Sequence, residues 1–374
     1  MNSGRTEVFH RMIGERIAMA RKDAHLTQQQ LSDQMGFKDR QILSNIEAGK
    51  RKVSADELMM LIRILRKDLP YFTDPLRLVG EGAFCWRAQA APLVLDSFEE
   101  KAKSLVAMYR TLGKQLGEEA GPLAHHLPIT ARSSFEEASA AGEHLARMWN
   151  LGEIPSQRLV KIAEDKLSIL VIYVDPPEDI SGAACHLGEF DSILINRNEP
   201  DGRRAFDFAH ELFHLLTWQA MPPERIDDEH SCQKNAKRRE QLANNFASAV
   251  LIPRSAIEER WNTINKPDIH KWLNKTAEEL DVTARALFWR MRNLGFISSG
   301  DALQISDERL IWNGRVPSRR ELPKLYSEKY VNRLREGIQR GLISVRRAAE
   351  VLDCTIDDLK DLIESYGLTA PFDL

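Results

Sequence analysis

The segment that most restricts how this chain can fold is His210-Glu211-Leu212-Phe213-His214. Residues i and i+4 lie on one face of an α-helix, so the two imidazoles can reach a single ion only if this segment is helical. Glu211 stands next to the first histidine, where its carboxylate can act as general base on a water bound to zinc. Its apolar neighbours indicate a buried helix from which water is excluded: Phe206, Phe208, Leu212, Phe213, Leu215 and Leu216. We therefore predict a Zn²⁺ site with His210 and His214 as metal ligands and Glu211 as the catalytic residue.

A catalytic zinc ion usually takes three protein ligands and keeps one position for water. The third ligand has to come from another part of the chain. Residue type alone leaves several downstream candidates, which are Asp227, Asp228, Glu229, His230, Cys232 and Glu240. Residues 227–237 are polar and loop-like, and from them His230 or Cys232 could contact the metal when no substrate is bound. Glu240 follows a run of basic residues and, taken by itself, would be interpreted as a surface charge.

Length and composition limit the class of protein. A chain of 374 residues is too long for one ordinary hydrophobic core, which predicts two or three domains. No run approaches the roughly 18 consecutive apolar residues of a membrane span. The start, Met1-Asn2-Ser3-Gly4-Arg5, lacks the apolar core of a signal peptide, so we expect a cytoplasmic protein without membrane contact. The cysteines form no CxxC pair, which fits a reducing compartment: Cys85, Cys185, Cys232 and Cys354.

The first 74 residues form a basic, helical segment, with 13 Lys and Arg against 10 Asp and Glu in a chain whose net charge is −3. Thr27 and Ser54 are suitable helix N-caps, and Gly36 and Gly49 are suitable helix ends. These signals predict helices over residues 28–35, roughly 39–47 and 55–65. A basic segment on an acidic protein points to nucleic acid as a partner.

Strand signals appear only in the middle of the chain. Short apolar runs bounded by turn residues predict strands over residues 167–174, 181–187 and 192–196, of which the last two flank Gly188 as a hairpin. Helices are expected in two parts of residues 95–150, over 158–165, around His210–His214 and beyond Pro253. The predicted fold class is α+β, predominantly helical.

Residues 203–216 and Glu240–Pro253 resemble the two signatures of the ImmA/IrrE metallopeptidases. The resemblance implies a zincin-like peptidase domain in which the glutamate that opens the E-x-x-A-N-x-F-A signature is the third zinc ligand. That glutamate is Glu240 here. Asn244, Ala247 and Leu251 follow it at helical spacing, so a second helix could lie against the first and direct the carboxylate inward.

Residues 180–183 and 193–197 resemble the small β-sheet that precedes the active-site helix in that family. An edge strand there could hold an extended peptide by strand addition. His186 and Tyr173 could assist at the oxyanion, although single histidines and tyrosines on strands more often have structural roles.

Residues 14–66 resemble the Xre/lambda-repressor helix-turn-helix domains, notably at residues 26–31 and 46–51. In such domains the third helix enters the major groove of double-stranded DNA, and neighbouring helix ends hold phosphates. By that analogy we expect base or backbone contacts from Lys38, Arg40, Gln41, Ser44 and Asn45, and phosphate contacts from Gln28, Lys50, Arg51 and Lys52. Gly36 to Gly49 is one residue longer than the commonest form, so the third helix should start in a different register. The alternative is a helical bundle used for protein contact or dimerisation.

Three domains follow from these patterns. They are an all-α helix-turn-helix domain over residues 1–74, a zinc metallopeptidase domain with a small β-sheet over 75–300, and a C-terminal helical module over 301–374. Residues 269–297 are again helix-turn-helix-like, which the resemblance places inside the catalytic fold. The final module could sense a signal, form a homodimer or dock a partner.

The resemblances imply a DNA-binding transcriptional regulator with zinc-dependent endopeptidase activity. Its partners would be operator DNA and a protein substrate, a transcription factor or antitoxin encoded nearby, whose cleavage derepresses a stress, mobile-element or defence operon. The alternative is a repressor or antitoxin whose zinc site is structural or sensory. A third hypothesis is that DNA, for example single strands produced by damage, activates the peptidase.

Overall fold

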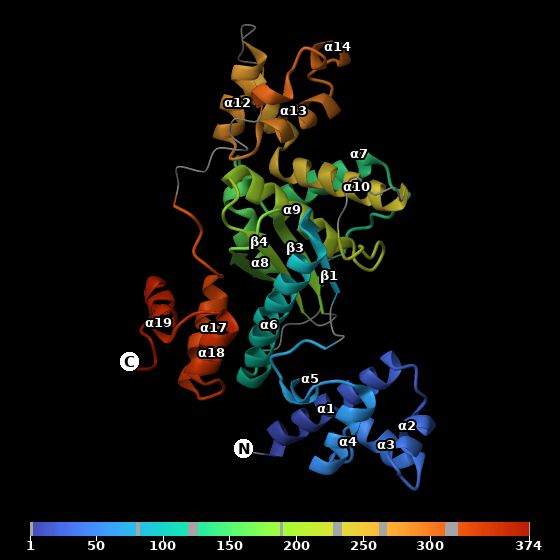
Figure 1. Cartoon of the computed structure of the whole chain (residues 1–374). Helices are drawn as coiled ribbons and strands as arrows, with labels where there is room; N and C mark the ends of the chain where they lie inside the picture. Colours follow the sequence, from blue (N-terminus) through green and yellow to red (C-terminus); the bar gives the residue numbers. More distant parts are fainter. Residues whose placement is uncertain are drawn as a thin grey trace. The chain divides into compact units, whose positions relative to one another are not determined.

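In the computed structural model of the chain, helices dominate and a small sheet lies in the middle of the sequence (Figure 1). The predicted class, α+β and predominantly helical, is confirmed. The chain forms two compact units, Met1–Glu81 with Glu100–Gln115, and Gly82–Glu99 with Leu116–Leu374. Among the residues that the structure describes, no helix is both long and apolar enough to cross a bilayer. The described residues are 3–79, 83–118, 126–187, 190–226, 234–261, 268–310 and 321–373.

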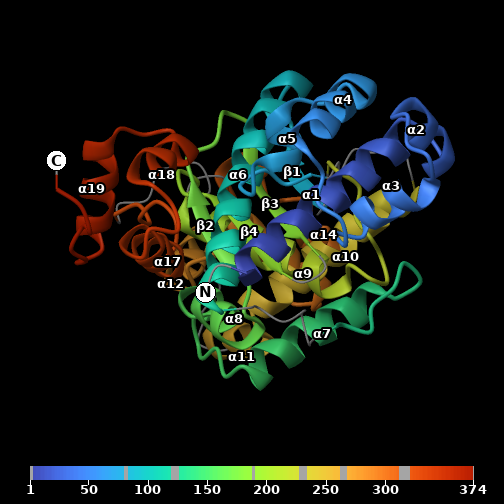
Figure 2. The same cartoon turned by 90° about the horizontal axis from the view of Figure 1, so that it is seen from below.

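The helices predicted for the N-terminal segment are confirmed (Figure 2). Thr27 and Ser54 each form a capping box with the third residue of the following helix, and Gly36 follows its helix with a φ of +69°. The carboxylate of Asp39 accepts a hydrogen bond from the backbone N–H of Gln41 (2.8 Å), so the third helix begins at Arg40. The helices are α1 (Ser3–Asp23), α2 (Gln28–Gln34), α3 (Arg40–Glu47), α4 (Ala55–Leu65) and α5 (Leu69–Thr73).

A mixed sheet in the order β1-β3-β4-β2 forms the centre of the second unit. The predicted hairpin is confirmed as an antiparallel pair, whereas β2 runs parallel to β4. The strand expected from residue 167 starts later, because the preceding helix α8 (Leu159–Leu167) continues to that residue. The strands are β1 (Ala83–Ala88), β2 (Leu170–Val174), β3 (Ile180–His186) and β4 (Asp191–Asn196).

The edge strand was placed wrongly by the sequence analysis. The two segments proposed for it belong to β3 and β4, which are the inner strands, and the edges are β1 and β2. β1 was not predicted, because both of its faces are covered and it lacks the alternation of a half-exposed strand. Phe84 and Trp86 stack on one face, where Trp86 also meets Phe98 of α6 (Pro92–Leu116), and Arg87 points to the other face.

Two helices form the motif region. α9 (Asp201–Thr217) carries His210–His214 and packs on β3 and β4. α10 (Lys234–Leu251) packs on α9 and along α7 (Phe135–Met148). α7 approaches α10 closely at Gly142, where a Cβ atom would lie 2.6 Å from the carbonyl oxygen of Phe246. Only glycine permits this approach, and it fixes the position of α10.

The remaining helices follow the motif region. Residues 269–297 form the predicted helix-turn-helix-like pair, and the C-terminal module is helical as predicted, with side-chain caps on its helices. This module contacts the sheet, since the backbone N–H of Tyr326 donates to the carbonyl of Tyr173 on β2 (2.9 Å). Domain limits at residues 74 and 300 stay predictions. The helices are α11 (Arg254–Trp261), α12 (Ile269–Glu279), α13 (Ala284–Asn293), α14 (Ser299–Ala302), α15 (Asp307–Leu310), α17 (Glu328–Gln339), α18 (Val345–Leu352) and α19 (Ile356–Ser365).

Candidate metal centre

Both histidines of the motif lie on the buried face of α9. His210 and His214 are 0% exposed, and their Nε2 atoms are 3.0 Å apart. This proximity follows from the one-turn spacing on a helix, as the sequence predicted. Glu211, between them in sequence, is also fully buried.

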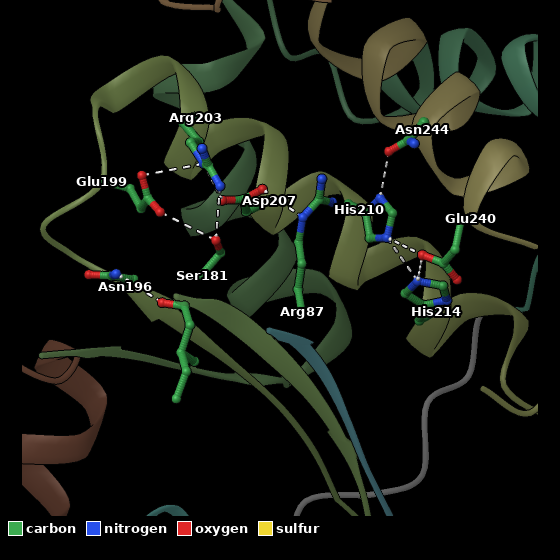
Figure 3. A network of polar contacts seen from close by, with 11 residues as sticks. Arg87, Ser181, Asn196, Glu199, Arg203, Asp207, His210, His214, Glu240 and Asn244 are labelled. Atoms are coloured by element: carbon green, nitrogen blue, oxygen red, sulfur yellow. Dashed lines mark hydrogen bonds and ion pairs between the residues drawn. The ribbon is translucent and has the colours of Figure 1, made fainter. Parts of the chain in front are cut away.

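α10 brings Glu240 to the two histidines. Its Oε2 lies 3.1 Å from Nε2 of His210 and 3.7 Å from Nε2 of His214 (Figure 3). The ring of Phe213 packs against Phe246 with centroids 5.4 Å apart, which holds α10 against α9. Glu240 is only 2% exposed, so its carboxylate is part of the interior and not a surface charge.

The separations of the three donor atoms fit a zinc ion. Ligand atoms at roughly 2.0–2.1 Å from zinc in a tetrahedron lie about 3.3 Å from one another. The observed separations of 3.0, 3.1 and 3.7 Å surround that value. Two imidazole nitrogens and one carboxylate oxygen are also the donor types of catalytic zinc sites. His210, His214 and Glu240 thus form a group that could hold the metal.

The electrostatic environment keeps Glu240 in the form that binds metals. Burial by itself would raise the pKa of its carboxyl, but the charge of His214 and hydrogen bonds with both histidines hold that pKa below its usual value. The carboxylate is therefore favoured, and metal ligands must be deprotonated. Arg239, which is 8% exposed, places its Nε 3.6 Å from Oε1 of Glu240.

Asn244 orients His210, a role that sequence reasoning did not assign. Its Oδ1 lies 3.0 Å from Nδ1 of His210, on the side of the ring opposite the cluster (Figure 3). An amide oxygen only accepts hydrogen bonds, so it favours the tautomer with the proton on Nδ1 and leaves Nε2 as a lone-pair donor. The signal was present in the sequence, since Asn244 is four residues after Glu240 on the same helix face.

A second polar network holds the first half of α9. Asp207, 1% exposed, lies 3.3 Å from Nε of Arg87 on β1 and 3.7 Å from Nε of Arg203 (Figure 3). Arg203 also donates to the hydroxyl of Ser181 on β3 (3.1 Å). These contacts tie the helix to two strands one turn before Glu211. An acidic residue in an apolar run was the only sequence signal for them.

The other candidates named from the sequence are not part of the described cluster. Asp227, Asp228, Glu229, His230 and Cys232 are outside the described residues. Nδ1 of His186 lies 2.6 Å from the buried Asp191, and its ring is 5.2 Å from that of Trp218, one turn beyond His214. Tyr173 lies on β2, at the other edge of the sheet from β1. A role for either residue at the oxyanion stays a prediction.

The residues predicted to contact DNA lie on or beside α2 and α3. Lys38, Arg40, Gln41, Lys50 and Lys52 are exposed, whereas Ser44 and Asn45 are half-buried. Carboxylates of the same unit bind the other two: Gln28 donates to Glu47 (2.7 Å), and Arg51 donates to Glu57 through two hydrogen bonds (2.7 and 3.0 Å). Lys38 and Arg40, at the start of α3, are therefore the stronger candidates for DNA contacts.

A buried His-His-Glu cluster beside a small mixed sheet is the arrangement of a metallopeptidase-like fold, and here a helical DNA-binding unit precedes it. Residues 164–290 match the model of the IrrE N-terminal-like domain, Peptidase M78, and residues 17–72 match a helix-turn-helix model. The chain thus joins a helix-turn-helix domain to a domain of the M78 peptidase family, which confirms the resemblances found in the sequence. Comparisons with curated proteins and with solved structures found no match.

Replacing Asn244 with Ala should lower the affinity for zinc about 10- to 100-fold, because His210 loses the acceptor that fixes its tautomer. The affinity is measured by competition with a chromophoric chelator. Asn244→Asp, which keeps an acceptor, should restore most of the loss.

The neighbouring Asn245 supplies the control. It is similarly half-buried, but its side chain donates to the backbone carbonyl of Gln241 (2.7 Å) instead of facing the histidines. Equal zinc affinities for Asn244→Ala and Asn245→Ala would show that Asn244 has no part in positioning His210.

Proposed function

We propose that this protein is a DNA-binding transcriptional regulator with zinc-dependent endopeptidase activity. It would cleave a partner repressor or antitoxin encoded nearby and so derepress a stress, mobile-element or defence operon. The observation that carries the proposal is the convergence of His210, His214 and Glu240, from two helices, on a volume the size of one metal ion. The match to the M78 peptidase family supports the same class of reaction.

In the proposed hydrolysis of a peptide bond, some side chains would bind the metal and another would transfer the proton. His210, His214 and Glu240 would hold Zn²⁺, which when bound polarises a carbonyl and lowers the pKa of a water molecule. Glu211 accepts the proton of the attacking water and delivers it to the nitrogen of the leaving amine. The apolar wall formed by Leu212, Phe213 and their neighbours keeps other water out, which strengthens the electrostatic interactions inside.

A structural or sensory zinc site is the second candidate. It is favoured by one observation: the three donor residues are at most 2% exposed, as in closed sites that exclude substrate. In that case the protein would act as a repressor or antitoxin through its helix-turn-helix domain. A structural site has no need of a general base, so Glu211 separates the two candidates.

Zinc-loaded protein mixed with the transcription factor encoded beside it should produce one discrete cut. Glu211→Gln should retain zinc and lower the cleavage rate by about two to four orders of magnitude, because the base is lost while the ligands remain. The rate is followed by gel electrophoresis and the cut is located by mass spectrometry.

Glu258→Gln is the matched control, because Glu258 is a half-buried glutamate paired only with Arg254 in the described structure. It should cleave as fast as the wild type. If the wild type and Glu211→Gln are equally inert or equally active under the same conditions, the peptidase proposal fails.

Replacing Lys38 and Arg40 together with Ala should weaken binding to the operator by at least about tenfold, since both contacts at the start of α3 are lost. Electrophoretic mobility shifts measure the affinity, and the zinc content should not change. The double variant Lys22→Ala/Arg63→Ala removes the same charge from exposed positions on α1 and α4. Equal losses in both double variants would mean that α3 does not read the DNA.

A further inference from the structure

The outer edge of β1 carries a segment of the protein's own chain. The backbone N–H of Trp86 donates to the carbonyl of Arg225 (2.8 Å), and Trp86 forms a parallel bridge with Ile226. We call residues 222–226 the strap. The outer edge of an edge strand has unpaired backbone N–H and C=O groups that can bind an extended chain. The strap pairs with these groups at Trp86, in the middle of β1.

Side chains anchor both ends of the strap. At one end, Arg225 donates to Glu99 of α6 (2.9 Å) and to Asp96. Glu99, only 7% exposed, also accepts from the indole N–H of Trp86 (2.7 Å), so one buried carboxylate holds the strap and the strand together. At the other end, Arg239 donates to the carbonyl of Pro222 (3.2 Å).

These anchors place the strap next to the metal centre. Arg239 directly precedes Glu240 on α10, and its own Nε lies 3.6 Å from the Glu240 carboxylate. The strap therefore runs from the side of the proposed third ligand to the edge of β1. Its first two residues are Pro222 and Pro223, whose fixed φ angles favour an extended chain.

β1 is linked to the helix that carries the motif at both of its ends. Near its end, Arg87 reaches Asp207, one turn before Glu211. At its start, Ala83 pairs with His186, whose ring lies 5.2 Å from that of Trp218, one turn after His214. The two ends of β1 are thus linked to positions before and after the two histidines, and an extended chain on its outer edge would run in the same direction past the metal centre.

We propose that the outer edge of β1 is the binding surface for an extended segment of the protein substrate and that the strap occupies it as an autoinhibitory contact. This inference rests on the proposed peptidase function. Backbone pairing to an edge strand requires an unfolded or flexible segment, so the substrate class is a protein with an exposed linker. Because the strap is tethered beside the edge, its effective concentration is high, and only a substrate that displaces it gains access.

The test uses the full-length Glu211→Gln protein, which keeps any bound substrate intact, and fluorescein-labelled casein as an unfolded probe. Arg225→Ala in this background removes both carboxylate contacts of the strap. Hydrogen exchange of the Trp86 amide should accelerate at least about threefold, and the Kd for casein, measured by fluorescence anisotropy, should fall by a similar factor. Arg254→Ala, which breaks an exposed ion pair on α11, should change neither quantity.

Unchanged exchange at Trp86, or faster exchange without tighter casein binding, would overturn the inference. Neither readout depends on catalysis. If Arg225→Ala binds casein more tightly but the enzyme with intact Glu211 cuts no protein, the strap inference holds and the peptidase proposal fails.

Discussion

Three ionisable side chains have to be buried with their donor atoms close enough to bind one metal ion. Much of the packing in the second unit holds them in this arrangement. His210, His214 and Glu240 are 0%, 0% and 2% exposed. Burying such groups without a partner costs several kcal/mol for each charge, and mutual pairing offsets only part of that cost. A divalent cation between them offsets much more. The contact of Phe213 with Phe246 and the close approach at Gly142 keep α9 and α10 near enough for the donors to meet.

The sequence specified the parts of this arrangement that depend on local spacing. The helix around His210–His214, the caps at Thr27 and Ser54 and the β3–β4 hairpin all follow from periodicity and turn chemistry, and the structure contains them. Glu240 was different. Its neighbours suggested a surface charge, and only the family resemblance assigned it to the metal.

The features that the sequence did not specify are set by packing between distant segments. β1 is covered on both faces, so its pattern did not distinguish it from a loop, and the edge strand was assigned to the wrong segments. Asn244 and Asp207 lie on faces that helical spacing identifies, but their partners come from other elements. Arg239 belongs to a run of basic residues that the sequence suggests is exposed to solvent. It is only 8% exposed, however, and contacts both Glu240 and the strap.

Under the proposed function, the first unit would recognise DNA and the second would hold a guarded hydrolytic site. In the first unit the buried pair of Arg21 and Glu47 (2.6 Å) joins α1 to α3. The exposed Lys38 and Arg40 lie at the start of α3, where the proposal places the DNA. In the second unit the strap, as proposed, would limit which peptides can reach the metal site. A regulator that destroys another regulator needs both forms of selectivity, because a hydrolase that cleaves unselectively would damage other proteins of the cell.

The central claim is that His210, His214 and Glu240 together bind one zinc ion. X-ray absorption at the zinc edge of the full-length protein tests it most directly, in the wild type and in Glu240→Gln. The account predicts two imidazole nitrogens and light oxygen ligands at about 2.0–2.2 Å in the wild type, and a weaker, altered site in the variant. A sulfur ligand at about 2.3 Å, or a spectrum that Glu240→Gln leaves unchanged, would contradict it.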